Sequence, residues 1–291
     1  VALVVAVEAD FPGAGGGLGG EFATQLMDLG GELILSDVKL ESLDRYKSYS
    51  GRGRVLAMIA GDIGSKEGTE RFLADVKKVT PCPDIIINNA GIAQAGAFGD
   101  VPLDRWEKLM NINLISPMRI CHFFLPDMKS RGSGHIVNIS SVAGIVPLPG
   151  GAPYTASKHG IKGFSDAIRL EYEKHGIHVS TVHPFFTRTA ILQSERFGIN
   201  VNVEDYPQFL IESPENVIRE TIKAIASKTD FILPGPTAKV LDLTRRLAPG
   251  MPLAQEAADV LHHHDRVVHQ QHQRDHEADD RELVDREAAH L

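Results

Sequence analysis

The first 37 residues, VALVVAVEADFPGAGGGLGGEFATQLMDLGGELILSD, decide the fold class. They open with a Val-rich apolar run of the kind found in strands that are buried on both faces of a parallel sheet. A glycine-rich turn follows, and the spacing of Phe22, Leu26 and Leu29 then predicts a helix that buries these three side chains. Residues 32–36 form a second apolar run. The stretch therefore predicts a strand, a glycine turn, a helix and a strand.

The glycine turn indicates a nucleotide site. Glycines in this position let backbone N–H groups approach a pyrophosphate at the N-terminus of the helix. Asp37 ends the second predicted strand, 24 residues after Gly13. A carboxylate there can accept hydrogen bonds from an adenine ribose diol and repels a 2′-phosphate, so we expect NAD rather than NADP. A helix cap or a solvated carboxylate is the alternative for Asp37.

Strands and helices continue to alternate after Asp37. Repeated alternation predicts an α/β fold with a single Rossmann-type, doubly wound parallel sheet of about seven strands, helices on both faces and a ligand crevice at the strand carboxyl ends. We expect further strands at 55–59, 84–87, 134–139 and 231–233, and helices at 67–79, 103–128 with an interruption near Pro117, 214–226 and 238–247.

Tyr154 and Lys158 are four residues apart in a segment that we expect to be helical from about Pro153. At this spacing the two side chains share one helical face. A phenol with a pKa of about 10 is a poor base at neutral pH, but a neighbouring positive charge favours the phenolate and lowers that pKa. The pair is a candidate proton-transfer device; an ordinary Tyr and Lys on a surface helix are the alternative. Ser140 and Ser141 lie at the C-terminal end of the strand predicted over 134–139.

Together these pieces resemble the NAD(P)-dependent short-chain dehydrogenase/reductase family over roughly residues 1–250. The resemblance implies an oxidoreductase that interconverts a secondary alcohol and a ketone by hydride transfer. The matching residues are Gly13, Gly17, Gly19, Asp62, Asn88, Asn89, Ala90, Gly91, Asn113, Ser141, Tyr154, Lys158, Pro184 and Thr189.

The resemblance also implies roles for individual residues. Tyr154 would be the general acid/base, and Ser141 would hydrogen-bond the substrate oxygen. Lys158 would hold the nicotinamide ribose and lower the Tyr154 pKa, and Asn113 would hold a water of the proton relay. No metal ligand is implied. The cofactor-binding residues would be Gly13, Gly17, Leu18, Gly19, Asp37, Asp62, Ile63, Asn89, Ala90, Gly91, Tyr154, Lys158, Pro184 and Thr189.

Three residues depart from the family pattern. Pro12 stands where the family has Thr before the first glycine, and it offers neither an N–H nor a hydroxyl. Gly20 replaces a long polar residue, which weakens the first helical turn. Phe185 replaces the glycine after Pro184, so a ring either forms an apolar pocket wall or partly blocks the site. A protein that binds NAD but serves as a regulator or scaffold is therefore the alternative function.

The segment around 190–206 occupies the family's substrate loop. Its apolar side chains suggest a steroid, a retinoid or another lipid-like alcohol or ketone as substrate; packing of the same side chains into the core is the alternative. Residues 184–250 resemble the branch that includes 17β-hydroxysteroid dehydrogenase types 11 and 13, which is partly lipid-associated, so membrane contact is a secondary hypothesis. The family also implies a homodimer or homotetramer.

Composition sets the remaining expectations. The 291-residue chain has two cysteines, no signal-peptide pattern and no apolar run that would span a bilayer, so we expect a cytoplasmic protein. We assign 1–253 to the catalytic domain and 254–291 to a polar tail, disordered or loosely helical, with metal binding by its histidines as an alternative. The tail holds ten acids and four bases, or −6 of the net charge of −8. The remaining −2 gives no basic surface for nucleic acid.

Overall fold

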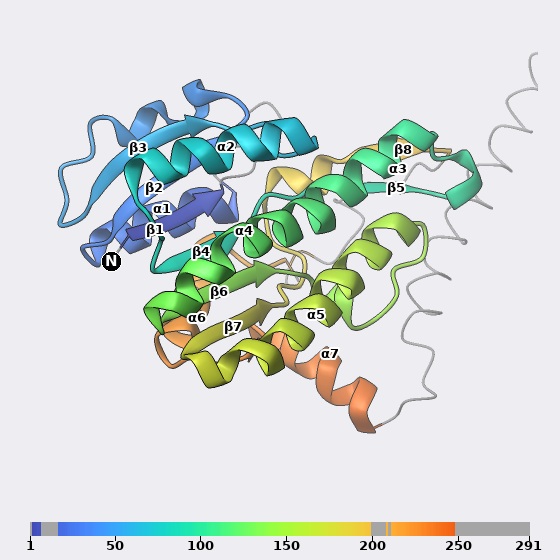
Figure 1. Ribbon diagram of the computed structural model, residues 1–291. Coiled ribbons are helices and arrows are strands. Elements are labelled where there is room, and N and C mark those ends of the chain that lie inside the picture. Colours follow the sequence, from blue (N-terminus) through green and yellow to red (C-terminus); the bar gives the residue numbers. More distant parts are fainter. Residues whose placement is uncertain (1, 7–16, 199–207, 209–210, 248–291) are drawn as a thin grey trace, which may run out of the picture.

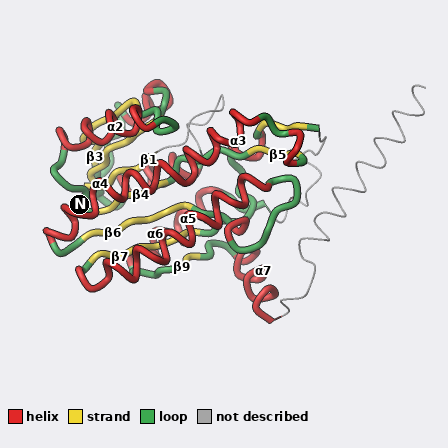
Figure 2. The backbone as a smooth tube through the Cα atoms, turned by 45° about the vertical axis from the view of Figure 1, so that its right-hand side comes forward, coloured by secondary structure: helices red, strands yellow, loops and turns green. Residues whose placement is uncertain are grey.

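The computed structural model describes residues 2–6, 17–198, 208 and 211–247, with the backbone alone for 2–6. Seven parallel strands form one sheet in the order β3–β2–β1–β4–β6–β7–β9 (Figures 1 and 2). The seven-stranded parallel sheet predicted from the alternation is thus confirmed. The strands are β1 (Ala2–Ala6), β2 (Glu32–Asp37), β3 (Arg54–Ala60), β4 (Ile85–Asn88), β6 (Gly134–Ile139), β7 (Ile177–Val182) and β9 (Phe231–Ile232).

Helices cover both faces of this sheet. One hydrophobic core lies between the sheet and α1 and α6, and a second lies between the sheet and α2, α4 and α5 (Figure 1). Phe22, Phe72 and Phe124 anchor these cores, and burial of each ring stabilises the fold by roughly 2–3 kcal/mol. The helices are α1 (Leu18–Asp28), α2 (Lys66–Val79), α3 (Leu103–Met110), α4 (Ser116–Arg131), α5 (Ala152–Tyr172), α6 (Pro214–Ala226) and α7 (Pro236–Leu247).

Helix α1 corrects one predicted core position. Phe22 is fully buried, but Leu29 is 67% exposed. Leu29 is the C-cap, one residue beyond the helix end, so it no longer follows the helical stripe. Met27 is buried instead. Gly20 does not prevent the first turn from forming, and its carbonyl accepts a hydrogen bond from the Tyr46 hydroxyl at 2.9 Å.

The long helix predicted over 103–128 is interrupted as expected, but at 111–115. A π-helical turn, η4 (Asn111–Ile115), joins α3 to α4. Pro117 itself lies in regular helix just after this turn. Because proline has no N–H, it cannot donate to the carbonyl four residues earlier, which belongs to Asn113. The interruption therefore falls on the turn that carries a predicted site residue.

A second, two-stranded parallel sheet was not predicted. Strand β5 (Gln94–Gly96) pairs with β8 (Glu195–Phe197), which belongs to the expected substrate loop. Glycine is required at 96, since a Cβ there would lie 2.5 Å from the Phe197 carbonyl oxygen. The pairing ties the substrate loop to the residues that follow β4.

Some predictions lie outside the described residues. These are Pro12 and Gly13 of the glycine turn, residues 199–207 of the substrate loop, and the 254–291 tail. Among the helices that are described, none combines the length and the apolar character needed to cross a membrane. Both cysteines are free.

Candidate active site

A pocket of about 360 Å³ opens beside the carboxyl ends of β4, β6 and β7. Because these strands are parallel, their carboxyl ends meet at one edge of the sheet, as the alternation predicted. Ser141, Tyr154 and Lys158 all line this pocket. The structure therefore brings together three of the four predicted catalytic residues, and Asn113 lies behind the pocket wall.

Lys158 lies beside the Tyr154 ring. Both come from the first turns of α5, and the Lys158 Nζ is 5.4 Å from the centre of the ring. The Lys158 side chain is buried, and its Nζ donates a hydrogen bond to the Ile139 carbonyl at 2.9 Å. The Ser140 hydroxyl donates to the Lys158 carbonyl at 2.9 Å. These two bonds fix the start of α5 against the end of β6.

Ser141 is held in place through its neighbours. The Ser140 N–H donates to the Val182 carbonyl at 2.8 Å, and the Val142 N–H donates to the Pro184 carbonyl at 3.0 Å. The Ser141 Oγ accepts a hydrogen bond from the Ala143 N–H at 3.1 Å. With one lone pair engaged, the hydroxyl keeps its own hydrogen for a ligand oxygen in the pocket.

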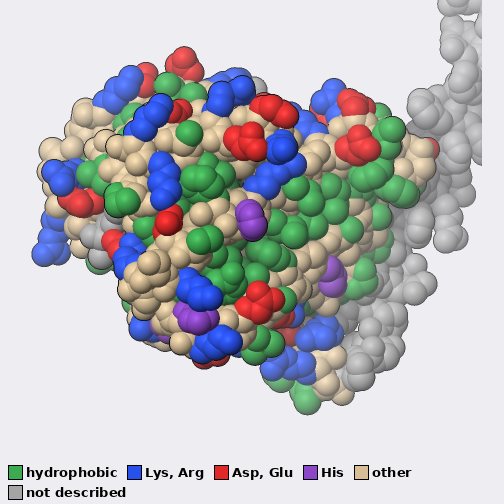
Figure 3. Space-filling view, viewed as in Figure 1, with side chains coloured by type: hydrophobic (Ala, Val, Ile, Leu, Met, Phe, Trp, Pro, Cys, Tyr) green, Lys and Arg blue, Asp and Glu red, His purple; other side chains and the backbone are tan. Residues whose placement is uncertain are grey.

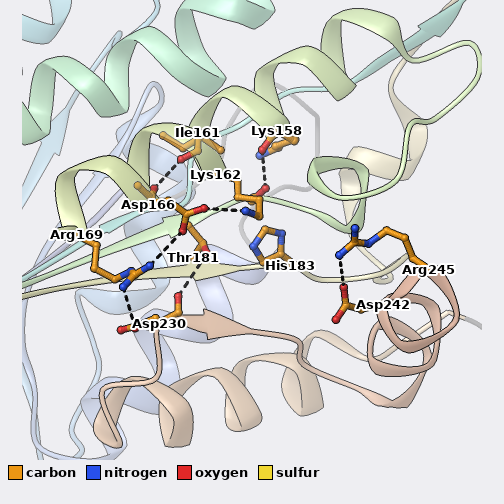
Figure 4. A network of polar contacts seen from close by, with 12 residues as sticks. Lys158, Ile161, Lys162, Asp166, Arg169, Thr181, His183, Asp230, Asp242 and Arg245 are labelled. Carbon is orange, nitrogen blue, oxygen red and sulfur yellow. Dashed lines mark hydrogen bonds and ion pairs between the residues drawn. The ribbon is translucent and has the colours of Figure 1, made fainter. Parts of the chain in front are cut away.

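His183 hydrogen-bonds to the same segment and was not predicted from the sequence. Its Nδ1 lies 3.0 Å from the Ser141 carbonyl oxygen, so Nδ1 carries the hydrogen and Nε2 is an acceptor. Figure 4 shows the ring between Lys162 of α5 and Asp242 of α7. The Nε2 is buried and has no hydrogen-bond partner within the described chain. Burial lowers the pKa of His183 to about 4.

The Asn113 side chain forms hydrogen bonds with the loop that follows β4. Its Oδ1 accepts from the Ile92 N–H and its Nδ2 donates to the Ile92 carbonyl, each at 2.9 Å. The same Nδ2 lies 3.2 Å from the Ser157 hydroxyl. The amide thus joins the π-helical turn to the loop and to α5. A Cβ on Gly91 would lie 3.4 Å from both the Asn113 Oδ1 and the Lys158 Nζ, so glycine keeps this corner open.

Asp37 ends β2 at the same sheet edge and is 2% exposed. Its Oδ1 accepts from the Lys39 N–H at 3.0 Å, whereas its buried Oδ2 has no partner among the residues that the structure describes. Burial raises the pKa of Asp37 above its usual range. A pair of hydroxyl donors would satisfy the second oxygen and favour the charged form.

The other predicted cofactor residues that the structure describes fall into three groups. Gly17 is the N-cap of α1, and Gly19 is buried in its first turn. Asp62, Ile63 and Ala90 do not line the pocket: Asp62 is exposed and accepts from the Gly64 N–H at 3.0 Å, and Ile63 packs in the core. The pocket is lined by the remaining predicted residues Leu18, Asn89, Gly91, Pro184 and Thr189.

Phe185 forms a wall of the pocket. It stands edge-on to Phe186 with 4.9 Å between the ring centres, and both rings line the cavity. Phe185 is thus part of an apolar wall around an open cavity of about 360 Å³. Gln94 and Arg196, from the small second sheet, also line it and were not predicted.

A family model described as short chain dehydrogenase matches residues 11–199, which is more than half of the chain. The chain belongs to the short-chain dehydrogenase family. Relatives of this short-chain dehydrogenase include the probable oxidoreductase EphD of Mycobacterium tuberculosis, 34% identical over 187 residues. That match covers 64% of this chain and 32% of EphD, so it spans about a third of the relative's length.

Two further comparisons cover more of both proteins. Epidermal retinol dehydrogenase 2 of Mus musculus is 35% identical over 227 residues, covering 76% of this chain and 71% of the relative. A metagenomic short-chain oxidoreductase solved in complex with NADP is 28% identical, with a TM-score of 0.63 and coverage of 81% and 97%. The parallel sheet and its helices are thus those of a Rossmann-type short-chain dehydrogenase.

The described residues fit a nicotinamide dinucleotide. Two buried polar atoms at the strand ends, the Asp37 Oδ2 and the Asn89 Nδ2, have no partner in the described part of the chain. Such atoms are destabilising unless a ligand satisfies them. The N-terminus of α1, with Leu18 in the pocket wall, lies where backbone N–H groups can meet a phosphate.

Proposed function

We propose that this short-chain dehydrogenase interconverts a secondary alcohol and a ketone. The observation that carries the proposal is the pocket shared by Ser141, Tyr154 and Lys158, with the ammonium 5.4 Å from the phenol ring. A bound nicotinamide dinucleotide supplies the hydride donor or acceptor. The chain's own residues then need to align the substrate and exchange one proton.

In this proposal Tyr154 exchanges that proton with the substrate oxygen. The neighbouring Lys158 charge stabilises the phenolate electrostatically. Ser141 donates a hydrogen bond to the same substrate oxygen. Its Oγ accepts from the Ala143 N–H, so the hydroxyl hydrogen is left for the substrate. General acid/base catalysis of this kind contributes about 10²–10⁴-fold to the rate.

Asn113 would support the proton path through its backbone. Its side-chain amide is engaged by Ile92 and Ser157. Its carbonyl cannot receive a hydrogen bond from Pro117, which has no N–H. We therefore assign the predicted water of the proton relay to the Asn113 carbonyl, with Lys158 as the neighbouring donor.

We propose NAD as the preferred cofactor. The buried Asp37 carboxylate would accept hydrogen bonds from the ribose diol through its unpartnered Oδ2 and would repel a 2′-phosphate. The metagenomic relative was solved in complex with NADP, so the comparisons do not favour NAD, and the proposal rests on this carboxylate. Dinucleotide contacts are assigned to Gly13, Gly17, Leu18, Gly19, Asp37, Asp62, Ile63, Asn89, Ala90, Gly91, Tyr154, Lys158, Pro184 and Thr189.

The substrate would be an apolar alcohol or ketone of steroid, retinoid or lipid type. Most side chains around the pocket are hydrophobic, and the similarity to a retinol dehydrogenase agrees with this class. The hydrophobic side chains that line the pocket include Val142, Val146, Pro147, Leu148, Phe185, Phe186, Ile191 and Leu192.

We also propose a homo-oligomer that is assembled through α4 and α5. Figure 3 shows hydrophobic side chains gathered on the face that carries α3, α4 and α5. Leu170 on α5 is 70% exposed and Phe123 on α4 is 38% exposed. Apolar side chains grouped on a helical surface are typical of a protein interface.

The test is a cofactor and substrate screen. The purified protein is incubated with NAD or NADP and a panel of hydroxysteroids, retinol and aliphatic secondary alcohols, and the absorbance of the reduced nicotinamide is followed. We expect turnover of apolar secondary alcohols with NAD. Binding of NAD without turnover of any substrate would favour the alternative of a regulatory or scaffold protein.

A further inference from the structure

One buried amide in the pocket has no role in the proposed chemistry. Gln94 is the first residue of β5, is 5% exposed and lines the same cavity as Ser141 and Tyr154. Its Nε2 is buried and has no hydrogen-bond partner among residues 2–6, 17–198, 208 and 211–247. Gln94 thus holds a buried amide donor without an acceptor in the wall of the cavity.

The backbone of β5 holds Gln94 in this place. Gln94 lies opposite Glu195 of β8, and Glu195 forms an ion pair with Arg105 of α3 at 3.3 Å. Two residues further on, the Gly96 N–H donates to the Gly150 carbonyl at 2.7 Å. Because both strand pairing and this bond fix β5, the chain cannot readily turn the amide out to water.

A buried donor without an acceptor is destabilising, by about 5- to 150-fold in the folding equilibrium. None of the acceptors among the described residues, including the hydroxyl and carbonyl oxygens of the cavity wall, forms a hydrogen bond with the Gln94 Nε2. Ala93 and Ala95, the residues on either side of Gln94 in the sequence, are apolar and also line the cavity. A ligand oxygen in the cavity would supply the missing acceptor.

The position of Gln94 indicates which ligand supplies the acceptor. The other unpartnered amide in the wall, the Asn89 Nδ2, lies directly after β4 and is assigned above to the dinucleotide. Gln94 lies beyond Gly91, on the strand that pairs with the substrate loop. Ser141 and Tyr154 on other elements already serve the reacting oxygen. An acceptor for Gln94 is thus a second oxygen of the substrate.

We propose that Gln94 is a substrate-positioning residue that donates a hydrogen bond to a second acceptor oxygen, remote from the carbon that exchanges hydride. The preferred substrates are then apolar alcohols or ketones with an additional carbonyl, ether or hydroxyl oxygen. This inference rests on the proposed function and narrows its substrate class.

The test uses pairs of apolar ketones with one carbon skeleton, in which a carbonyl distant from the reduced ketone is present or is replaced by methylene. The ratio of kcat/KM values within a pair is measured for the wild type, for Gln94→Leu and for Gln94→Met as a second apolar variant. We expect the wild type to favour the dioxygenated ketone by about tenfold or more, and both variants to show a ratio near one. Ser194→Ala, which removes a hydroxyl from the same wall, should keep the wild-type ratio.

Three results would overturn the role of Gln94. The first is a wild-type ratio near one, and the second is a preference that survives in both apolar variants. The third is an equal loss with both ketones together with weaker dinucleotide binding, which would make Gln94 a cofactor contact. Turnover of neither ketone by the wild type would count against the proposed function instead. Calorimetric binding of the same ketone pair to the dinucleotide-loaded protein would still measure the preference in that case.

Discussion

Replacing His183 by asparagine tests whether its ring is buried in the neutral form. In the folded protein the Nδ1–H faces the Ser141 carbonyl, the Nε2 has no partner in the described chain, and burial lowers the pKa to about 4. An asparagine side chain keeps an N–H near the position of Nδ1. The substitution therefore removes the titrating ring while keeping a donor for the Ser141 carbonyl.

The size of the effect follows from the two pKa values. A histidine in an unfolded chain titrates near 6.5, so between about pH 6.5 and about pH 4 the unfolded state holds a proton that the folded state lacks. The stability contributed by the neutral ring is present above this window and is lost as the pH falls through it. The loss is about 3.4 kcal/mol when complete, and about 2 kcal/mol of it has occurred at about pH 5.

Urea denaturation at about pH 7.5 and about pH 5 measures this difference. Between the two conditions the free energy of unfolding of the wild type should fall by about 2 kcal/mol more than that of His183→Asn. His135, whose pKa burial also lowers to about 4, is present in both proteins and cancels in the comparison. His122→Asn, at an exposed position, is the matched control and should follow the wild type. An equal fall in the wild type and His183→Asn would refute burial of a neutral ring.

Three further substitutions test the cofactor site and the interface. Asp37→Ala should lower the NAD to NADP ratio of kcat/KM by about tenfold or more, because it removes the carboxylate that repels a 2′-phosphate; preference for NADP by the unmodified protein would contradict the assignment. Lys158→Met should lower kcat and raise KM for the dinucleotide, and an unchanged kcat would exclude Lys158 from the proton transfer. Leu170→Glu should shift the protein to smaller species in size-exclusion chromatography with multi-angle light scattering, since it places a charge on an exposed apolar position of α5. An unchanged mass would exclude this face from the interface.

The sheet and its layers were predictable because local signals repeat along the chain. Apolar runs of strand length alternate with helical spacing, and a glycine turn and Asp37 mark the first two strand ends. The shared helical face of Tyr154 and Lys158 follows from a spacing of four residues. Each of these features depends on residues that are close together in the sequence, so it can be predicted from the sequence alone.

Pairings between distant segments were not predictable. Strands β5 and β8 are three residues long and about a hundred residues apart, so neither shows a strand pattern of its own. The sequence likewise carries no sign that His183 would turn towards Ser141, or that Gln94 would be buried without a partner. Such contacts depend on how the ends of separate strands meet, which local patterns do not encode. The π-helical turn at Asn113 was predictable in part, because Pro117 indicated that the helix is interrupted but did not indicate at which residues.

The proposed catalytic role of Tyr154 is tested most directly by Tyr154→Phe. The change removes one hydroxyl and keeps the ring that lies 5.4 Å from the Lys158 ammonium. With a substrate found in the screen, we predict that kcat falls by about 10²–10⁴-fold. We also predict that the Kd for the dinucleotide, measured by calorimetry, changes by less than about threefold, because the ring of Tyr154 is kept. A threefold change corresponds to about 0.7 kcal/mol of binding free energy. Turnover close to the wild-type rate would contradict the assignment of Tyr154 as the general acid/base.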